Sequence, residues 1–181
     1  MAMLLTVGFI VPLSAAEQQF NEQAVSLLKQ TIAETSSFED RFDAEVWLTD
    51  MSHRLSRFVK DEQTRLRILK AVHAEAMRYD LEPEWVLAVM QVESAFDPYA
   101  LSIVGAQGLM QVMPFWRKEM GNEEANLTHI ETNIGYGCAI LKTYLKIEKG
   151  RLAPALARYN GSYGKLKYPK KVFKALRNYW Y

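Results

Sequence analysis

Residues 92–114 read VESAFDPYALSIVGAQGLMQVMP and follow an apolar run that begins at Pro83. The run has the spacing of an amphipathic helix over residues 83–93, and Pro83 suits its first turn because the missing N–H has no partner there. Asp-Pro, two glycines, and amide and hydroxyl side chains follow, and these residues are typical of turns and of close backbone approach. The stretch therefore predicts a helix that ends at a carboxyl group and continues into a polar loop.

Glu93 has an unusual position on this predicted helix. At about 100° per residue, it lies in the middle of the side that carries Val86, Val89 and Met90. The opposite side carries Glu84, Ala88 and Gln91. Burial of a glutamate raises its pKa and favours the protonated form that a general acid requires. The alternative is a frayed helix end with Glu93 in water, which is the commoner fate of a single glutamate.

The loop after Glu93 favours the first interpretation. Asp97 could be a second catalytic carboxylate, but its Asp-Pro setting favours a structural turn. Hydroxyl and amide groups that bind neutral polar ligands such as sugars surround two glycines: Ser102, Gln107 and Gln111 around Gly105 and Gly108. Neither GxxxxGKS/T nor GxGxxG is present, so a phosphate cradle is not favoured. We therefore expect a neutral polyhydroxylated substrate.

The rest of the chain also has helical spacing. Apolar residues recur every three to five positions in residues 20–32, 42–58 and 66–77, and further helices are predicted at 133–150, 151–159 and 170–180. No alternating strands are found, and residues 105–108 allow a small hairpin at most. A length of 181 residues fits one domain with appendages. We predict a mainly α fold: a helical domain preceded by N-terminal helices.

Composition excludes several classes of function. The formal net charge of +1 gives no strong field for nucleic acid. Cys138 is the single cysteine, so no intramolecular disulfide can form, and its apolar neighbours predict a buried helix position. His53, His73 and His129 lack metal-ligand spacing. We therefore predict no metal and no cofactor, and we expect a monomer because no oligomer signal is found.

Residues 1–16, MAMLLTVGFIVPLSAA, contain no charged side chain and end in small residues. This composition is typical of the apolar core and cleavage site of a secretory signal peptide, although the usual basic residues are missing. A membrane anchor is the alternative, but the apolar run from Met3 to Leu13 is shorter than the about 20 residues that a spanning helix needs. We predict cleavage before Glu17 and a periplasmic or secreted protein.

Three motifs resemble the signature of the soluble-type lytic transglycosylases (SLT domain, glycoside hydrolase family 23), which have a lysozyme-like fold and are related to goose-type lysozymes. The first consists of Glu93-Ser94, Phe96-Asp97-Pro98, Ala100, Ser102, Gly105-Ala106, Gly108-Leu109-Met110-Gln111 and Met113-Pro114. NIGYGCAILKTYL at 133–145 and ALARYNGS at 155–162 resemble the second and third. The motifs come in the family's order and spacing, and the resemblance covers residues 66–181.

The resemblance implies that Glu93 is the sole catalytic acid and base. The substrate-binding residues that it implies are Ser102, Gly108, Gln111, Met113, Tyr159 and Asn160. Tyr159 is expected close to Glu93, and Asn160 is expected mainly to shape a turn. The implied reaction is non-hydrolytic cleavage of the β-1,4 bond between N-acetylmuramic acid and N-acetylglucosamine in peptidoglycan, with formation of 1,6-anhydromuramic acid. Two stretches depart from the family pattern: Gly161-Ser162 after Tyr159-Asn160, and Phe115-Trp116 after Met113-Pro114.

We also predict a division of the chain, in which the resemblance implies the catalytic domain alone. Residues 1–16 are the signal peptide, residues 17–62 form an N-terminal helical segment, and residues 63–181 form the lysozyme-like catalytic domain. The segment 17–62 either braces the domain or binds a cell-envelope protein partner.

Three alternative functions stay open. A hydrolysing lysozyme of the same fold needs a water opposite Glu93, and a non-catalytic peptidoglycan-binding envelope protein needs no acid. The third is nucleic-acid binding by a basic and aromatic C-terminal run: Lys165, Lys167, Lys170, Lys171, Lys174 and Arg177 with Tyr168, Tyr179 and Trp180. A solvated helix with packed aromatic residues explains that run better, so we predict no nucleic-acid partner.

Overall fold

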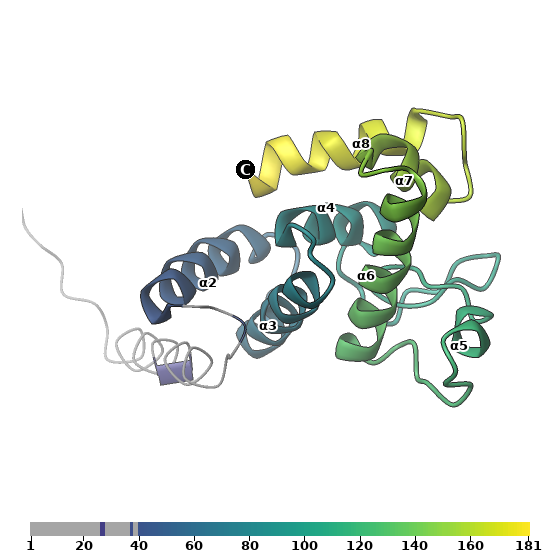
Figure 1. The fold of residues 1–181 in the computed structure, drawn as a ribbon. Coiled ribbons are helices and arrows are strands. Elements are labelled where there is room, and N and C mark those ends of the chain that lie inside the picture. The colour runs from purple at the N-terminus through teal and green to yellow at the C-terminus, as the bar shows by residue number, and fades with distance from the viewer. Residues whose placement is uncertain (1–25, 28–36, 38–39) are drawn as a thin grey trace, which may run out of the picture.

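The computed structural model describes residues 26–27, 37 and 40–181 (Figure 1). Its elements are α2 (Arg41–Leu55), α3 (Glu62–Arg78), α4 (Pro83–Ser94), the short α5 (Trp116–Glu119), α6 (Ile130–Ile147), α7 (Leu152–Tyr159), α8 (Lys167–Ala175) and the π-helical turn η1 (Leu176–Trp180). Strand-like pairing in this part of the chain is limited to two isolated antiparallel bridges, Leu101 with Gln107 and Gln107 with Val112. The prediction of a mainly helical fold with at most a small hairpin is confirmed.

The predicted signal peptide, residues 1–16, lies outside the described residues. The predicted helix at 20–32 also lies outside them, except for Ser26 and Leu27, which are helical. None of the helices in the described part of the chain combines the length and the hydropathy that a membrane span requires.

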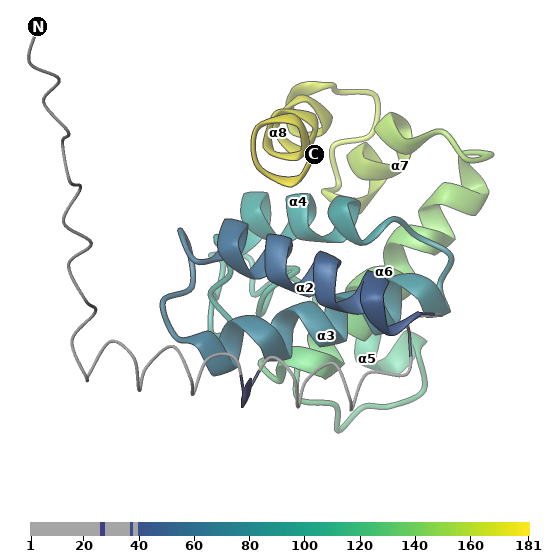
Figure 2. The same cartoon turned by 90° about the vertical axis from the view of Figure 1, so that its left-hand side faces the viewer.

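The centre of the fold is α4, the helix that carries Glu93. It contacts α3, α8 and η1. Figure 2 shows α8 on one side of α4 and α3 on the other. Residues 86–90 are completely buried. A helix that is covered on all sides is apolar over its whole circumference, and this explains the continuous run VLAVM.

The side of α4 that carries Glu84, Ala88 and Gln91 is also covered by neighbouring helices. Ala88 is completely buried. The indole N–H of Trp47 in α2 donates to Glu84 Oε1 at 2.8 Å, and that of Trp180 in η1 donates to Gln91 Oε1 at 2.9 Å. Helices from the two ends of the described chain therefore cover this side, and indole donors satisfy its polar atoms.

The helix α2 braces the domain. Its N-cap Asp40 accepts hydrogen bonds from the backbone N–H groups of Phe42 and Asp43, which stabilises the first turn. One side of α2 is buried against α3 and η1. The Arg54 guanidinium donates to the carbonyl oxygens of Tyr179 and Tyr181, both at 3.1 Å. This part of the segment 17–62 therefore holds the last helical turn in place.

Candidate active site

Glu93 lies in the last turn of α4 and is half-buried. The hydroxyl of Tyr168 in α8 donates a 2.6 Å hydrogen bond to Glu93 Oε1. Burial raises the pKa of Glu93, while the Tyr168 hydrogen bond and the positive charge of Lys171 oppose the rise. The net direction is upward, as the sequence predicts for a glutamate on the apolar side of this helix.

The chain reverses sharply just after Glu93. Ala95 and Phe96 both have left-handed backbone conformations, with φ of 49° and 68°. The left-handed conformation costs roughly 1–2 kcal/mol for each non-glycine residue, so contacts with neighbouring residues must stabilise it. The Phe96 ring is buried against Phe58 and Trp180, at centroid distances of 5.3 and 5.6 Å, and the Ser94 hydroxyl donates to the Leu109 carbonyl at 2.7 Å. These contacts fix the end of α4 and thereby the carboxyl group of Glu93.

In the loop that follows, Asp97 has the structural role that its Asp-Pro setting predicts. The backbone N–H of Tyr99 donates to Asp97 Oδ1 at 2.9 Å, and the Asp97 side chain is exposed. This arrangement is an Asx turn. Asp97 is therefore a turn residue in this structure and not a second carboxylate beside Glu93.

Ser102 and Gln111 hold the loop together through its backbone. The N–H of Ala106 donates to Ser102 Oγ at 2.9 Å. The side-chain amide of Gln111 donates to the carbonyl oxygens of Ala100 and Gly108 at 3.1 and 3.0 Å. The contacts of Ser102 and Gln111 with a sugar stay predictions.

A buried asparagine connects this loop to α6. Asn133 is 1% exposed. Its Oδ1 accepts from the Met110 N–H at 2.7 Å, and its Nδ2 donates to the carbonyl oxygens of Gln107 and Leu127 at 2.8 and 2.7 Å. The sequence analysis missed this role. The available signal was one amide side chain at the start of the otherwise apolar motif NIGYGCAIL.

Gly108 is required at its position by packing. Its φ is +74°, and a Cβ atom there would overlap the Leu127 carbonyl oxygen and the Asn133 side chain. In α6, a Cβ atom on Gly137 would overlap the side chain of Met110. The loop and α6 therefore approach each other closely at two glycines. A direct contact of Gly108 with substrate stays a prediction.

Tyr159 lies at the end of α7 and points toward the same loop. Its hydroxyl donates to the Met110 carbonyl at 2.8 Å. Burial raises the pKa of Tyr159 well above its ordinary value, and the negative charge of Glu93 adds to the rise. Tyr159 is thus within electrostatic range of Glu93, on the side of the site that the third motif forms.

A hollow of about 300 Å³ lies next to Glu93. Its lining consists of Val92, Glu93, Asn160, Ser162, Lys165, Lys167, Tyr168 and Lys171. Of the predicted site residues, it brings together Glu93 and Asn160. Ser102, Gly108, Gln111, Met113 and Tyr159 are not among its lining residues.

The residues after Tyr159 form one wall of this hollow. Asn160 ends α7 and donates its N–H to the Leu156 carbonyl at 3.1 Å. Gly161 then has a φ of 67°, and the Ser162 N–H returns to the Ala157 carbonyl at 2.7 Å. The backbone at Asn160 therefore belongs to a tight turn, while the residue itself lines the hollow.

Tyr168 and Lys171 are the residues whose role at Glu93 the sequence analysis missed. Both belong to α8, in the basic and aromatic run that predicts a solvated helix with packed aromatic residues. The packing of the aromatic residues is confirmed, since Tyr168 and Trp180 are 6% and 1% exposed. Their buried rings are not available to stack on nucleic-acid bases.

A second hollow of about 530 Å³ is lined mainly by α3 and contains Glu75 and Glu131. Glu131 at its rim forms an ion pair with Arg67 at 2.6 Å, and the hydrogen bond from Arg67 lowers the pKa of Glu131. A carboxylate with a lowered pKa stays ionised near neutral pH and donates no proton.

Histidine and cysteine side chains are placed apart from the site. His73 bonds Ser37 Oγ through Nδ1 at 2.8 Å, and burial lowers its pKa to about 4. Cys138 is buried, as predicted, and burial raises the pKa of its thiol. Across the residues that the structure describes, no three His, Cys, Asp or Glu side chains are grouped to hold a metal ion.

The chain is similar to parts of longer proteins. It is 54% identical over 46 residues to the "Membrane-bound lytic murein transglycosylase C" of Actinobacillus pleuropneumoniae serotype 5b (strain L20), which covers 25% of this chain and 13% of that protein. It is 35% identical over 112 residues to the "Transglycosylase" of Enterobacteria phage PRD1, covering 58% of this chain and 41% of that protein. The chain thus spans less than half the length of these curated relatives.

Among solved structures, an inactive mutant of the lytic transglycosylase Slt from Pseudomonas aeruginosa matches at 22% identity with a TM-score of 0.49. The match covers 91% of this chain and 32% of that one. The family model described as "Transglycosylase SLT domain" matches residues 70–179, which is more than half of the chain. The resemblance carried by the three motifs is confirmed: this chain belongs to the transglycosylase SLT domain family.

Proposed function

We propose that this protein is a peptidoglycan lytic transglycosylase. It cleaves the β-1,4 bond between N-acetylmuramic acid and N-acetylglucosamine and leaves a 1,6-anhydromuramic acid end. The observation that carries the proposal is Glu93, a half-buried carboxyl group with a raised pKa that opens into a hollow. Membership of the SLT family supplies the substrate class, and the names of the relatives support it.

The hydrogen bond from Tyr168 makes the two carboxyl oxygens of Glu93 different. It occupies Oε1, whereas Oε2 accepts no hydrogen bond within the described part of the structure. Oε2 is therefore the atom available for proton transfer to and from the substrate. In the first step, the Glu93 carboxyl group protonates the leaving oxygen while the C1–O bond of the muramic acid breaks.

The second step uses the same group as a base. The Glu93 carboxylate takes the proton of the muramic C6 hydroxyl, and the C6 oxygen bonds to C1 and closes the anhydro ring. Burial favours the protonated form for the first step. The Tyr168 hydrogen bond and the Lys171 charge stabilise the carboxylate for the second. The proton returns to Glu93, and no water is consumed.

The surroundings of Glu93 favour a mechanism with one carboxyl group. Glycosidases that use two place them roughly 5–10 Å apart across the bond. Glu93 is the one acidic residue in the lining of the hollow, and Asp97 is engaged in its turn. A hydrolase would need another group to hold its water.

The division of the chain and its location belong to the same proposal. Residues 1–16 act as a signal peptide, residues 17–62 as an N-terminal helical segment and residues 63–181 as the catalytic domain in the periplasm or outside the cell. The relatives named as membrane-bound murein transglycosylases support an envelope location. Mass determination of the exported protein tests the cleavage site: a mature chain that begins at Glu17 is expected.

The reaction is tested by mass spectrometry of the fragments released from purified peptidoglycan, with Glu93→Gln as the matched variant. We expect fragments that end in 1,6-anhydromuramic acid, and we expect them to be lost in the variant while its circular dichroism spectrum stays unchanged. Reducing-end fragments, one water heavier, would indicate a lysozyme. No fragments from the unaltered protein would favour a binding protein, and cleavage by the variant would contradict the role of Glu93.

A further inference from the structure

Three lysines surround the hollow beside Glu93. Lys165 lies in the turn between α7 and α8, and Lys167 and Lys171 lie one helical turn apart on α8. All three are exposed and line the hollow together with Asn160. We call these three residues the lysine cluster.

The lysine cluster forms no ion pair among the described residues. Among the described residues, no ion pair joins any of its three ammonium groups to a carboxylate. The one acid in the same lining is Glu93, whose protonated form begins the proposed reaction. The hollow therefore has an excess of positive charge when substrate enters.

The N-terminal end of α8 adds to the positive electrostatic potential of the hollow. The first turn of α8 contains no acidic residue and begins with Lys167. The N-terminal end of a helix carries a partial positive charge that favours anions and disfavours lysines. A helix start built in this way is suited to bind an anion that the protein itself does not supply.

The substrate class contains such anions at one place. The sugar rings of peptidoglycan are neutral, while the lactyl group of each muramic acid carries a peptide with free carboxylates. In the proposed reaction, the ring cleaved beside Glu93 is a muramic acid, so its peptide leaves the strand next to the hollow. We propose that the lysine cluster binds the carboxylates of this peptide, so that the protein selects peptide-bearing glycan strands. This inference rests on the proposed function.

The aromatic residues nearby favour a peptide over a nucleic acid. Single-stranded nucleic acids bind where basic side chains alternate with exposed aromatic rings. Tyr168 is buried and donates to Glu93, and Trp180 is buried and donates to Gln91. No stacking platform of these residues faces the lysine cluster.

The test compares intact glycan strands with strands whose peptides an amidase has removed. The readout is the peptide preference: kcat/KM on intact strands divided by kcat/KM on stripped strands, measured by release of anhydromuramic ends. We expect the unaltered protein to prefer intact strands, and the preference to fall when the salt concentration rises from about 0.05 to about 0.5 M.

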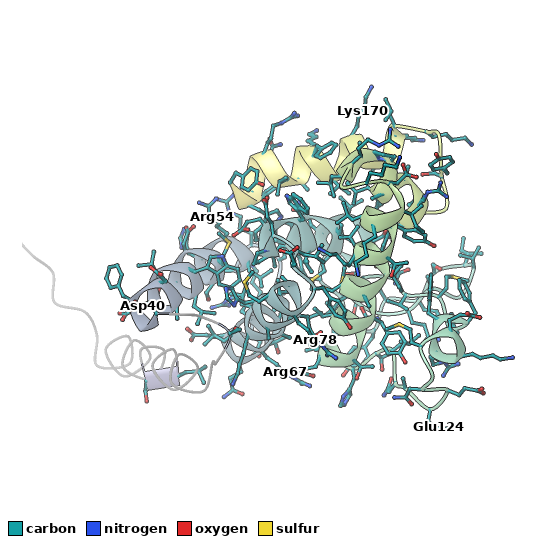
Figure 3. The ribbon with its side chains drawn as sticks, in the orientation of Figure 1. Asp40, Arg54, Arg67, Arg78, Glu124 and Lys170 are labelled. Carbon is teal, nitrogen blue, oxygen red and sulfur yellow. The ribbon has the colours of Figure 1, made fainter. Side chains whose placement is uncertain are left out.

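The decisive variant is Lys165→Gln/Lys167→Gln. Lys171 is kept because its charge acts on Glu93. We expect the peptide preference to fall roughly two- to tenfold, mainly through KM, because exposed ion pairs change an affinity by small factors. The matched control is Lys170→Gln/Lys174→Gln, which removes the same charge from exposed positions of α8 outside the hollow. Figure 3 shows Lys170 pointing away from the protein. We expect the control to keep the preference of the unaltered protein.

Two results would overturn the inference alone. One is equal kcat/KM of the unaltered protein on both strands, and the other is an equal loss of preference in the two double variants. In both, cleavage of stripped strands would still support the proposed function. Failure of the unaltered protein to cleave either strand would overturn the proposed function and this inference with it.

Discussion

The two regions that flank Glu93 serve it in different ways. The side chains of the polar loop at residues 98–114 form hydrogen bonds with the loop's own backbone, and the loop is also bonded to Asn133 in α6. In contrast, α8 sends Tyr168 directly to the carboxyl group, from 75 residues further along the chain. The difference teaches that the loop helps to hold the end of α4, whereas α8 modulates the pKa of Glu93 by opposing the rise that burial causes. Changes in the loop should therefore affect stability first, and changes in α8 should affect the pH dependence of the reaction.

The strongest test of the loop's role is Asn133→Ala. It leaves the Met110 N–H and the Leu127 carbonyl oxygen without their partner in a buried place, while the Gln107 carbonyl oxygen still accepts from the Val112 N–H. Each unpaired buried group costs about 1–3 kcal/mol, so we expect the free energy of unfolding to fall by about 3 kcal/mol or more. Urea unfolding followed by circular dichroism measures the change.

The control for this variant is Thr143→Ala, at an exposed position of the same helix. We expect its free energy of unfolding to change by less than about 0.5 kcal/mol. Equal losses in the two variants would contradict the bracing role of Asn133.

Substitutions at two glycines of the same loop can separate the effect of packing on stability from the effect of backbone strain. Gly105→Ala and Gly108→Ala both place a side chain at positive φ, but a Cβ atom meets nothing at Gly105 and overlaps neighbouring atoms at Gly108. We expect the free energy of unfolding to fall by about 1–2 kcal/mol in Gly105→Ala, from backbone strain alone. At Gly108 we expect about 1–3 kcal/mol more, from overlap. Thermal unfolding of the two variants compares these losses. Equal losses would show that the loop can move away from α6.

The sequence predicts the scaffold of this site better than its electrostatics. Helical spacing is local, so the periodic pattern is sufficient to find α4 and to place Glu93 among apolar residues. The cover over Glu84 and Gln91 on α4 could not be predicted, because Trp47 and Trp180 lie far away along the chain. The role of Tyr168 could not be predicted for the same reason: a tyrosine in a lysine-rich amphipathic run has the same pattern whether it only packs in the core or also bonds Glu93.

The role of α8 is tested by Tyr168→Phe. The variant removes a hydrogen bond that lowers the pKa of Glu93, so the pKa of Glu93 should rise further. The proposed reaction needs Glu93 protonated at its start, so kcat/KM should fall as the pH rises through this pKa. We expect the alkaline limb of the pH profile to move to higher pH, with a lower kcat because Oε1 is no longer held.

The matched variant for Tyr168→Phe is Tyr179→Phe. Tyr179 contributes a ring to the packing around Phe58, and its hydroxyl makes no hydrogen bond within the described residues. Its pH profile should coincide with that of the unaltered protein. An alkaline limb that stays in place in Tyr168→Phe would show that another group sets the pH dependence.

The smallest expected effect concerns the stability of the site itself. Burial raises the pKa of Glu93 in the folded protein above its ordinary value of 4.5, so the folded state holds this proton more tightly than the unfolded state. The stability that this proton provides is fully present below the unfolded pKa and is lost as the pH rises through the folded pKa. Above the folded pKa, the ionised Glu93 is therefore a cost to folding.

The variant Glu93→Gln removes this cost and keeps an oxygen that accepts from Tyr168. We expect it to be more stable than the unaltered protein at neutral pH, and we expect the difference to disappear well below pH 4.5. Urea unfolding at a series of pH values measures this dependence. A variant that is less stable at neutral pH would mean that the ionised carboxylate gains more from Tyr168 and Lys171 than it loses by burial, and Glu93 would then be poised as a base rather than as an acid.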